Sequence, residues 1–255
     1  MRLVVTRPLD DARRQAAKLT ALGHEPVIHP LLEIVYPPLT PLALGGVQAL
    51  IATSRNALRG LSRNGSFDAS KRLPIYCVGE HTADFARRMG FSQIVSGKGT
   101  AMELAPQIIR AVKPASGALL YLTGETLAFD LETPLIAAGF AVPRLIVYEA
   151  REIGRVGAAQ LAERLRGGAD GVILMSPRTA SIFVDLIKSF KLEREARAIT
   201  CYCYSNAIAK PLREIDGLTT AISSHPTEKH MLALIGPAPF RSAAVADLKD
   251  ALGEH

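Results

Sequence analysis

The chain has 255 residues, of which 48% are hydrophobic and 21% charged, a composition typical of globular proteins and too apolar for a disordered chain. Its length suits one large or two small domains. The net charge is +6, but the basic residues are scattered and tryptophan is absent, so we expect a small polyanionic ligand and no nucleic-acid partner.

Apolar runs typical of strands alternate with helical patterns along the chain. Each run precedes a segment with helical spacing, such as Ala12, Ala16 and Leu19 after the first one. Continuous apolar strands that alternate with helices predict parallel sheets covered on both faces. The clearest strands are expected at residues 3–6, 49–53, 74–78, 118–122, 171–175 and 199–203.

The order of these segments repeats within the chain. The repeat aligns Thr6 with Thr123 and Ser54 with Ser176. The matching pairs are 4–30 with 120–146, 49–58 with 172–181, less closely 74–91 with 199–216, and 97–108 with 225–235, which places Thr100 opposite Thr227.

The repeat can be divided into domains in two ways. In one division the domains are two consecutive halves of the chain. In the other, the segment 4–30 joins the segments 172–181 and 199–216 in one domain, and the middle of the chain forms an inserted domain. The stretches EIVYPPLTPLALGG and VYEAREIGRVG have the composition of linkers, which favours the second division. We therefore predict a discontinuous domain of residues 1–34 plus 153–255, an inserted domain of residues 40–146, and linkers at 35–39 and 147–152.

Polar residues follow the predicted strands, where open α/β sheets bind ligands. Any single one is equally an ordinary helix N-cap, worth about 1 kcal/mol. As a set, these hydroxyl groups, arginines and free helix N–H groups suit a ligand with carboxylates or phosphates. The candidate binding residues are Thr6, Arg7, Thr53, Ser54, Gly79, Thr82, Thr100, Thr123, Gly124, Ser176, Arg178 and Ser205.

Signatures of established cofactor and metal sites are missing. No G-x-G-x-x-G follows a strand, and no Cys/His set has zinc spacing. His225 and His230 are five residues apart and do not share a helix face, while His24 and His29 are expected to be surface or capping groups. This combination suits a reactive substrate to which the protein supplies shape and hydrogen bonds; we expect no cofactor and no metal.

The chain also lacks the signals of membrane insertion and secretion. No run approaches the roughly 18 apolar residues of a membrane helix, and Arg7 follows a very short apolar run at the N-terminus. Three cysteines, Cys77, Cys201 and Cys203, lie in strand-like surroundings, where at least one is expected in the core. We therefore expect a cytoplasmic protein without disulfides or a membrane partner.

The order and spacing of several short motifs resemble those of the uroporphyrinogen-III synthase family over nearly the whole chain. The resemblance implies an α/β fold of two doubly wound parallel-sheet domains (flavodoxin/Rossmann-like), the first discontinuous, joined by a two-stranded ladder. The motifs are VVTRP (4–8), IATSRNAL (51–58), CVGEHTADFARRMGF (77–91), LTGE (122–125), VYEA (147–150), ILMSPRTASIF (173–183) and HPTEKHMLALI (225–235).

The same resemblance implies a cofactor-independent hydro-lyase. It would cyclise the linear tetrapyrrole hydroxymethylbilane to uroporphyrinogen III, with inversion of ring D through a spiro intermediate and loss of water. The eight carboxylates of that substrate agree with the positive net charge. We expect the chain to act as a monomer.

The resemblance makes Tyr148 the strongest candidate for a catalytic side chain, assisting departure of the substrate hydroxyl as a hydrogen-bond donor or acid. Tyr148 lies in one of the two predicted linkers between the domains. The other linker also contains a Val-Tyr pair, at residues 35–36, so a tyrosine in such a linker can also be structural. In the family, a Gly and a Thr often follow the strand that corresponds to 199–203, but here Tyr204, Ser205 and Asn206 follow it. A role for that threonine therefore cannot be transferred, although Ser205 can still donate.

Two other functions remain open. One is a non-catalytic two-domain sensor that binds a small polyanion; a sensor would usually need an output module, and none is visible. The other is a transferase or nucleotide enzyme, whose glycine fingerprint is missing.

Overall fold

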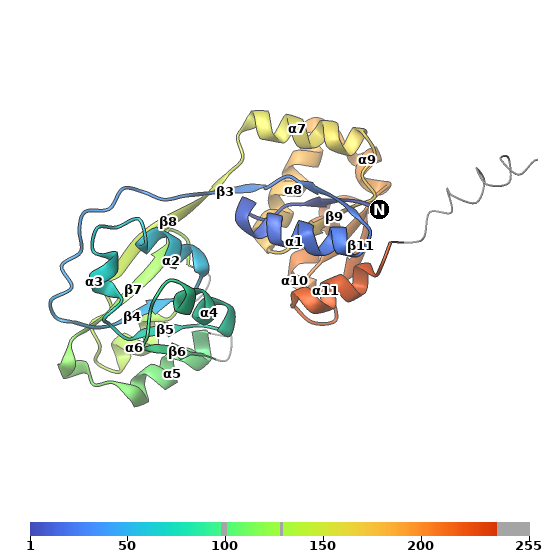
Figure 1. Cartoon of the computed structure of the whole chain (residues 1–255). Coiled ribbons are helices and arrows are strands. Elements are labelled where there is room, and N and C mark those ends of the chain that lie inside the picture. Colours follow the sequence, from blue (N-terminus) through green and yellow to red (C-terminus); the bar gives the residue numbers. More distant parts are fainter. Residues whose placement is uncertain (98–100, 128–129, 239–255) are drawn as a thin grey trace, which may run out of the picture. The chain divides into compact units, whose positions relative to one another are not determined.

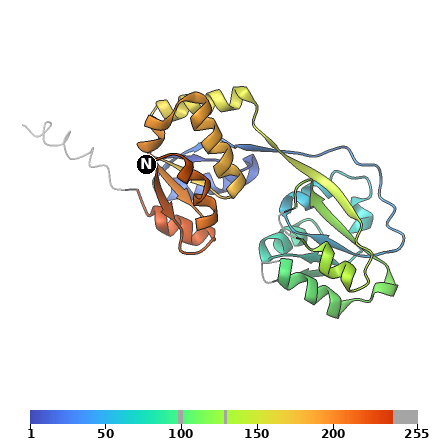
Figure 2. The same cartoon turned by 180° about the vertical axis from the view of Figure 1, so that it is seen from behind.

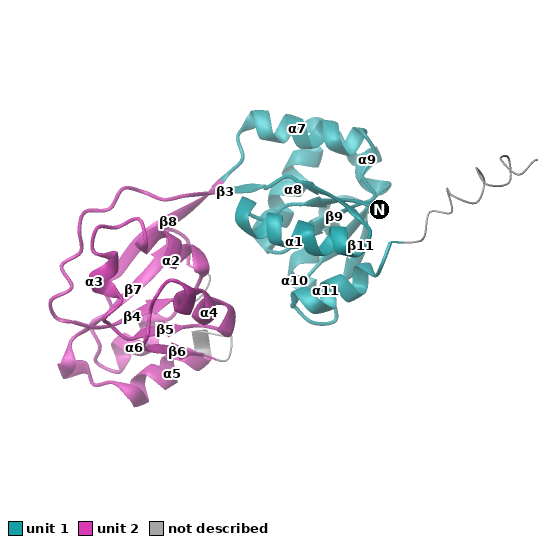
Figure 3. Cartoon of the chain, viewed as in Figure 1, with its two compact units in different colours: residues 1–33, 152–255 teal, residues 34–151 magenta. Residues whose placement is uncertain are grey.

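The computed structural model describes residues 1–97, 101–127 and 130–238 (Figure 1 and Figure 2). The chain forms two compact units (Figure 3). Unit 1 contains Met1–Glu33 and the described residues from Glu152 onward, and unit 2 contains Ile34–Arg151. Unit 1 is therefore discontinuous in sequence.

Unit 1 is built on one parallel sheet with the strand order β11-β10-β9-β1-β2. Its strands are β1 (Arg2–Val5), β2 (Glu25–Ile28), β9 (Gly171–Leu174), β10 (Thr200–Cys203) and β11 (Thr219–Ile222). Its helices are α1 (Leu9–Ala21), α7 (Arg155–Arg166), α8 (Pro177–Phe190), α9 (Glu193–Arg197), α10 (Asn206–Ala209), η2 (Pro211–Glu214) and α11 (Glu228–Ile235).

Unit 2 has a sheet with the strand order β3-β8-β7-β4-β5-β6. Its strands are β3 (Leu32–Val35), β4 (Val47–Ala52), β5 (Ile75–Cys77), β6 (Ile94–Ser96), β7 (Ala118–Gly124) and β8 (Arg144–Glu152). Its helices are α2 (Arg55–Leu61), α3 (Phe67–Ser70), α4 (Glu80–Arg88), α5 (Ala101–Ala111), η1 (Pro114–Ser116) and α6 (Glu132–Ala137).

The strands β3 and β8 are neighbours in this sheet and carry the two passages of the chain between the units. The segment 147–152, expected to be an irregular linker, is instead the second half of β8. Val147 is buried in the core that Leu145 also contacts, so the strand continues beyond the predicted boundary.

The two sheets repeat the same strand order, as the sequence repeat predicts. The series β10-β9-β1-β2 of unit 1 corresponds in sequence to β5-β4-β7-β8 of unit 2. The segment 4–30 contributes β1 and β2 to unit 1, and the matching segment 120–146 contributes β7 and the start of β8 to unit 2. In each sheet these two strands lie at the same end of the series.

Apolar side chains of the unit 2 sheet alternate between its two faces. Ala49 and Ile51 join a core with α5 and α6, whereas Leu50 and Ala52 join a separate core with α2 and α4. Strands buried on both faces explain the continuous apolar runs in the sequence. In unit 1, α1 lies in front of the sheet in Figure 1 and α8 in front of it in Figure 2.

The α/β class and the parallel sheets are confirmed. Each strand that the sequence predicts is present, with ends that differ by at most two residues. Among the described helices, none has both the length and the apolar composition needed to cross a bilayer.

Candidate active site

The carboxyl ends of parallel strands gather the predicted residues of unit 2 at one edge of its sheet. The strand β4 pairs in parallel with β5 and β7, and β7 pairs in parallel with β8. Thr53 and Ser54 follow β4, Gly79 follows β5, Gly124 ends β7, and Tyr148 lies on β8. This is the edge at which open α/β sheets bind ligands.

Tyr148 and Ser54, which are 94 residues apart in sequence, form a side-chain hydrogen bond. The Ser54 hydroxyl donates to the Tyr148 phenol oxygen, with 3.2 Å between the two oxygens. The same Ser54 oxygen accepts the Ala57 backbone N–H at 3.1 Å and so caps helix α2. Tyr148 is half-buried, so its phenol lies at the boundary between core and solvent.

A β-bulge turns Tyr148 toward Ser54. Residues 144–146 of β8 pair one-to-one with β7, but Gly124 then pairs with Tyr148, which leaves Val147 as the extra residue. Successive side chains of a regular strand point to opposite faces, yet Val147 and Tyr148 both pack on the core that contains α2. Bulges often redirect a side chain in this way beside active sites.

Gly124 provides the space that the Tyr148 ring occupies. A Cβ at Gly124 would lie 2.7 Å from Tyr148 Cζ and 3.0 Å from the phenol oxygen, closer than van der Waals contact permits. Gly124 was predicted to bind substrate, but it is buried next to this ring.

The other predicted residues of unit 2 have different environments. Thr53 is partly exposed and hydrogen-bonds with the phenol of Tyr121, and Gly79 is the extended N-cap of α4. Thr82 is buried in the first turn of α4, and Thr123 is 1% exposed with its hydroxyl bound to the Gly124 carbonyl. The hydroxyl of Thr123 therefore has its acceptor within its own strand. The prediction for Thr100 lies outside the described residues.

Tyr121 was not predicted from the sequence as part of this edge. Burial raises the pKa of its phenol, and the hydrogen bond with Thr53 opposes that shift. The stretch ALLYL indicates only a core strand, so nothing local distinguishes Tyr121 from the apolar residues around it.

Unit 1 places its predicted residues at the carboxyl edge of its own sheet. Thr6 is 1% exposed, and its hydroxyl donates to the Ile173 carbonyl at 2.7 Å. Thr6 therefore ties the end of β1 to the neighbouring strand β9, whereas the hydroxyl of Thr123, its counterpart in the repeat, binds the carbonyl of the next residue in its own strand. Both hydroxyl groups are buried and have an acceptor within the protein, and the substrate-binding role of Thr6 and Thr123 stays a prediction.

Arg7 is the partly buried cation at this edge. Desolvation lowers the pKa of its guanidinium, while the nearby Tyr204 and Glu228 act in the opposite direction; an arginine nevertheless stays charged at neutral pH. Arg7 also forms an ion pair with Asp11 at 3.5 Å. Tyr204 is almost fully buried, and burial raises the pKa of its phenol to about 12.

Ser176, Arg178 and Ser205 lie at the starts of helices α8 and α10. Ser176 is the N-cap of α8 and shares a capping box with Thr179. Arg178 is exposed and pairs with Glu152 at 3.8 Å. Ser205 is the extended N-cap residue of α10, and its side chain makes no capping bond.

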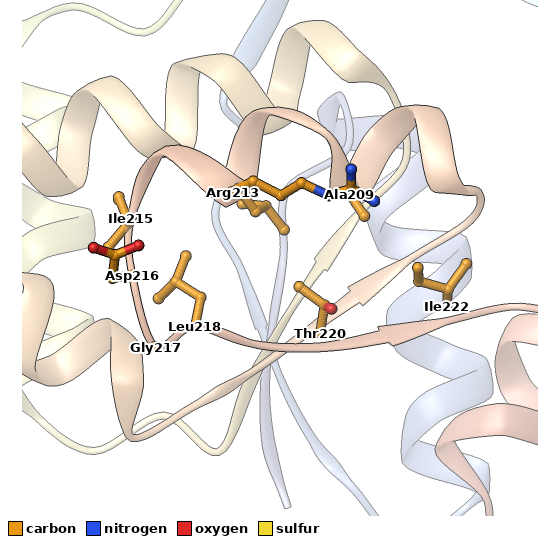
Figure 4. Close-up of a pocket in the computed structure, with 9 residues that line it drawn as sticks. Ala209, Arg213, Ile215, Asp216, Gly217, Leu218, Thr220 and Ile222 are labelled. Carbon is orange, nitrogen blue, oxygen red and sulfur yellow. The ribbon is translucent and has the colours of Figure 1, made fainter.

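A pocket in unit 1 lies away from these residues. It is formed mainly by η2, β11 and the turn between them, with Arg213, Asp216 and Thr220 among its lining side chains (Figure 4). None of the predicted binding residues lines it. We therefore assign the candidate site to the sheet edges and not to this pocket.

Histidines and cysteines are the side chains that could provide metal ligands or a reactive thiol. His24 and His29 are buried, so the prediction that they lie at the surface is wrong; His24 does bind the carbonyl of Gly236, the C-cap residue of α11, and His29 binds the Gly157 carbonyl. His225 and His230 do approach one another, with ring centroids 4.4 Å apart, because His225 precedes α11 and is not constrained by helix spacing. Within the described parts of the chain, no three His, Cys, Asp or Glu side chains are grouped as metal ligands.

The three cysteines are free and buried. Burial raises the thiol pKa of Cys77 and Cys201 to about 12 and that of Cys203 to about 11. The reactive thiolate form is therefore disfavoured, and these residues act as core side chains.

Two doubly wound α/β units, with hydroxyl groups and cations at the carboxyl edges of their sheets, define a two-domain α/β protein suited to a small anionic ligand. Comparison with known families makes the assignment specific. The chain matches the family model described as Uroporphyrinogen-III synthase HemD over residues 13–233, which is most of its length. The chain belongs to the uroporphyrinogen-III synthase family.

Solved structures support the same fold. A uroporphyrinogen-III synthetase from Helicobacter pylori is 21% identical, with a TM-score of 0.61 over 92% of this chain and 98% of that chain. A mutant uroporphyrinogen III synthase from the extremely thermophilic bacterium Thermus thermophilus is 18% identical, with a TM-score of 0.57 over 99% of this chain and 98% of that chain. A sequence search of curated proteins found no significant match.

Proposed function

We propose that this chain is a lyase that cyclises hydroxymethylbilane to uroporphyrinogen III with inversion of ring D and loss of water. The observation that carries the proposal is the family match over residues 13–233. The alternatives of a sensor and of a nucleotide enzyme receive no support from the comparisons.

Tyr148 is the proposed acid of this reaction. Its phenol proton passes to the departing hydroxyl of the substrate, the C–O bond breaks, and water leaves. The phenolate regains a proton when a substrate carbon loses one on ring closure, so the enzyme ends the cycle unchanged. The half-buried position of Tyr148 and its hydrogen bond to Ser54 support this role, because an acid must be positioned as well as accessible.

The substrate carboxylates are the proposed ligands of the remaining edge residues. Arg7 and Arg178 supply positive charge in unit 1, where Ser176 and Ser205 supply hydroxyl groups. In unit 2, helix α4 begins at Gly79 with backbone N–H groups directed toward the edge of the sheet. The partly exposed Thr53 is the further hydroxyl of that edge.

Product analysis tests the proposed reaction. Hydroxymethylbilane is supplied with and without the protein, and the oxidised products are separated into type I and type III isomers. We expect the type III isomer to increase with protein concentration. If only the spontaneous type I isomer forms at every protein concentration, the proposed function is wrong.

Substitution of Tyr148 tests its role. Tyr148→Phe removes the proton donor but keeps the ring, so we expect kcat to fall by about 10-fold or more while the fold is retained. Circular dichroism serves as the folding control. An unchanged kcat would remove Tyr148 from the chemistry.

A cytoplasmic location and a monomeric state are also part of the proposal. The three free, buried cysteines support a reducing compartment. Cell fractionation tests the location, and light scattering of the purified protein tests the monomer.

A further inference from the structure

We propose that Ser54 and Gly124 are positioning residues that aim the phenol proton of Tyr148 toward the substrate. This inference rests on the proposed function, because it assigns a task to two residues that act only through Tyr148. It also gives Gly124 a different role from the substrate binding predicted from the sequence.

The hydrogen bonds around Ser54 give the direction of the proton. The Ser54 oxygen accepts the Ala57 N–H at 3.1 Å, and the Ser54 proton is donated to the Tyr148 oxygen at 3.2 Å. Because the Tyr148 oxygen is the acceptor in this bond, its own proton is left to point away from Ser54. The same donor stabilises the phenolate that forms when this proton is transferred.

The repeated half of the chain offers an internal comparison. Ser176 occupies the same place in unit 1, and it accepts the Thr179 N–H at 3.1 Å as Ser54 accepts that of Ala57. The Ser176 backbone N–H donates to the Thr179 hydroxyl at 3.2 Å, which completes the capping box, and the Ser176 hydroxyl itself lies 3.0 Å from the Thr179 hydroxyl. Ala57 has no hydroxyl group, so the proton of Ser54 is available to Tyr148.

Two glycines allow the approach of Ser54 to Tyr148. Gly124 leaves room for the Tyr148 ring, since a Cβ there would lie 2.7 Å from Tyr148 Cζ. Gly60 lets helix α2 approach β8, since a Cβ there would lie 2.1 Å from the Val147 carbonyl oxygen. Ser54 precedes the first residue of that helix, and Tyr148 follows Val147. The contact therefore depends on both close approaches.

Substitutions of Ser54 separate the donor from the helix cap. Glycine is tolerated as an N-cap but has no hydroxyl, whereas threonine provides both a cap and a donor. We expect Ser54→Gly to lower kcat about 3- to 10-fold, the effect of one lost hydrogen bond, with KM changed less than about twofold. Ser54→Thr should restore kcat to within about twofold of the wild type.

The matched control is Ser62→Ala. Ser62 lies at the other end of α2, and its hydroxyl donates to the Arg59 carbonyl at 2.8 Å without contacting Tyr148. This variant also loses one hydroxyl group next to α2, but its kcat should equal that of the wild type. If Ser54→Gly and Ser62→Ala both keep the wild-type kcat, Ser54 does not position Tyr148.

A double-mutant cycle tests Gly124. Gly124→Ala should displace the Tyr148 ring and lower kcat about 10-fold, whereas Gly65→Ala, where a Cβ meets nothing within 4 Å, should not. If Gly124 acts through Tyr148, the double variant Gly124→Ala/Tyr148→Phe should have a kcat within about twofold of that of Tyr148→Phe alone. Losses that multiply in the double variant would overturn the inference.

The failure of this inference is distinguishable from the failure of the proposed function. The wild-type protein tests the function alone, through the appearance of the type III isomer. If the wild type forms this isomer and Tyr148→Phe slows it, the function stands whatever the variants of Ser54 and Gly124 do. Normal kcat in Ser54→Gly and Gly124→Ala would then contradict only the positioning role.

Discussion

Gly60 lies in helix α2 at the point where the helix passes strand β8. A Cβ at this position would meet the Val147 carbonyl oxygen at 2.1 Å and Val147 Cβ at 2.8 Å. The obstructing oxygen belongs to the backbone of the sheet, so it cannot move aside as a flexible side chain would. The absence of a single side chain thus permits the packing of α2 on β8.

Gly60→Ala is therefore expected to destabilise the protein. In an unconstrained helix interior, alanine is favoured over glycine by roughly 0.5–1 kcal/mol, but overpacking of a close contact costs about 1–3 kcal/mol. We expect the free energy of unfolding in urea to fall by about 1–3 kcal/mol. Gly65→Ala, with open space around it, is the control and should change little; a more stable Gly60→Ala would contradict the close approach.

At the scale of elements, a buried histidine joins the end of β2 to the start of α7. His29 directly follows β2, and its Nε2–H donates to the Gly157 carbonyl at 2.9 Å. Desolvation lowers the pKa of His29; the bond to Gly157 opposes this shift, and the charge of Arg164 adds to it. The folded protein therefore favours the neutral ring.

Stability is expected to depend on pH through His29. Because its folded pKa lies below its ordinary value near 6.5, the unfolded chain binds more protons between these two values, and stability is lost as pH falls through this window. We expect the free energy of unfolding to decrease between about pH 7.5 and about pH 5.5. His29→Gln replaces the ring N–H with an amide N–H donor that does not titrate. The free energy of unfolding of this variant should therefore decrease less over the same pH range. Equal slopes in the two proteins would show that His29 contributes nothing to the dependence.

At the scale of the whole molecule, unit 2 has its own hydrophobic cores. One core lies between the sheet and α5 and α6, and the other between the sheet and α2 and α4. All residues of both cores lie between Leu39 and Tyr148, inside the unit. Burial of apolar surface is the main favourable term in folding, so this unit contains the source of its own stability.

The segment 34–151 is therefore expected to fold by itself. Far-UV circular dichroism should show a cooperative thermal transition, as small single domains usually do. Amide hydrogen exchange should protect β4 and β7, the central strands of its sheet. A gradual, non-cooperative melting curve would mean that the segment needs the rest of the chain.

The positive charge of the whole chain predicts how ligand affinity responds to salt. The net charge is +6, and the proposed ligand is an anion with several carboxylates. Screening at high ionic strength weakens attraction between exposed charges. We expect the Kd of the substrate or product to rise several-fold between about 0.05 M and about 0.5 M NaCl, measured by isothermal titration calorimetry. An unchanged Kd would argue against recognition through carboxylates.

Much of the fold could be predicted from the sequence, because strand and helix patterns are local. Continuous apolar runs indicated the strands, and the linker-like composition of two stretches favoured a discontinuous first domain. The polar residues after each strand were also predictable, since parallel strands all end at the same edge of a sheet. The role of Tyr148 came from the family resemblance and stays a proposal.

The contacts within the site depend on tertiary structure. Residue spacing cannot reveal the bulge at Val147, which places Tyr148 on the face of α2, or the 3.2 Å contact with Ser54. Nor does a threonine after a strand show whether its hydroxyl faces a ligand or a neighbouring strand, as Thr6 does. The sequence determined which elements form and in what order, because backbone preferences act over a few residues. Only the three-dimensional fold decided which side chains meet, because strand register and the close approach of helices join residues far apart in the chain.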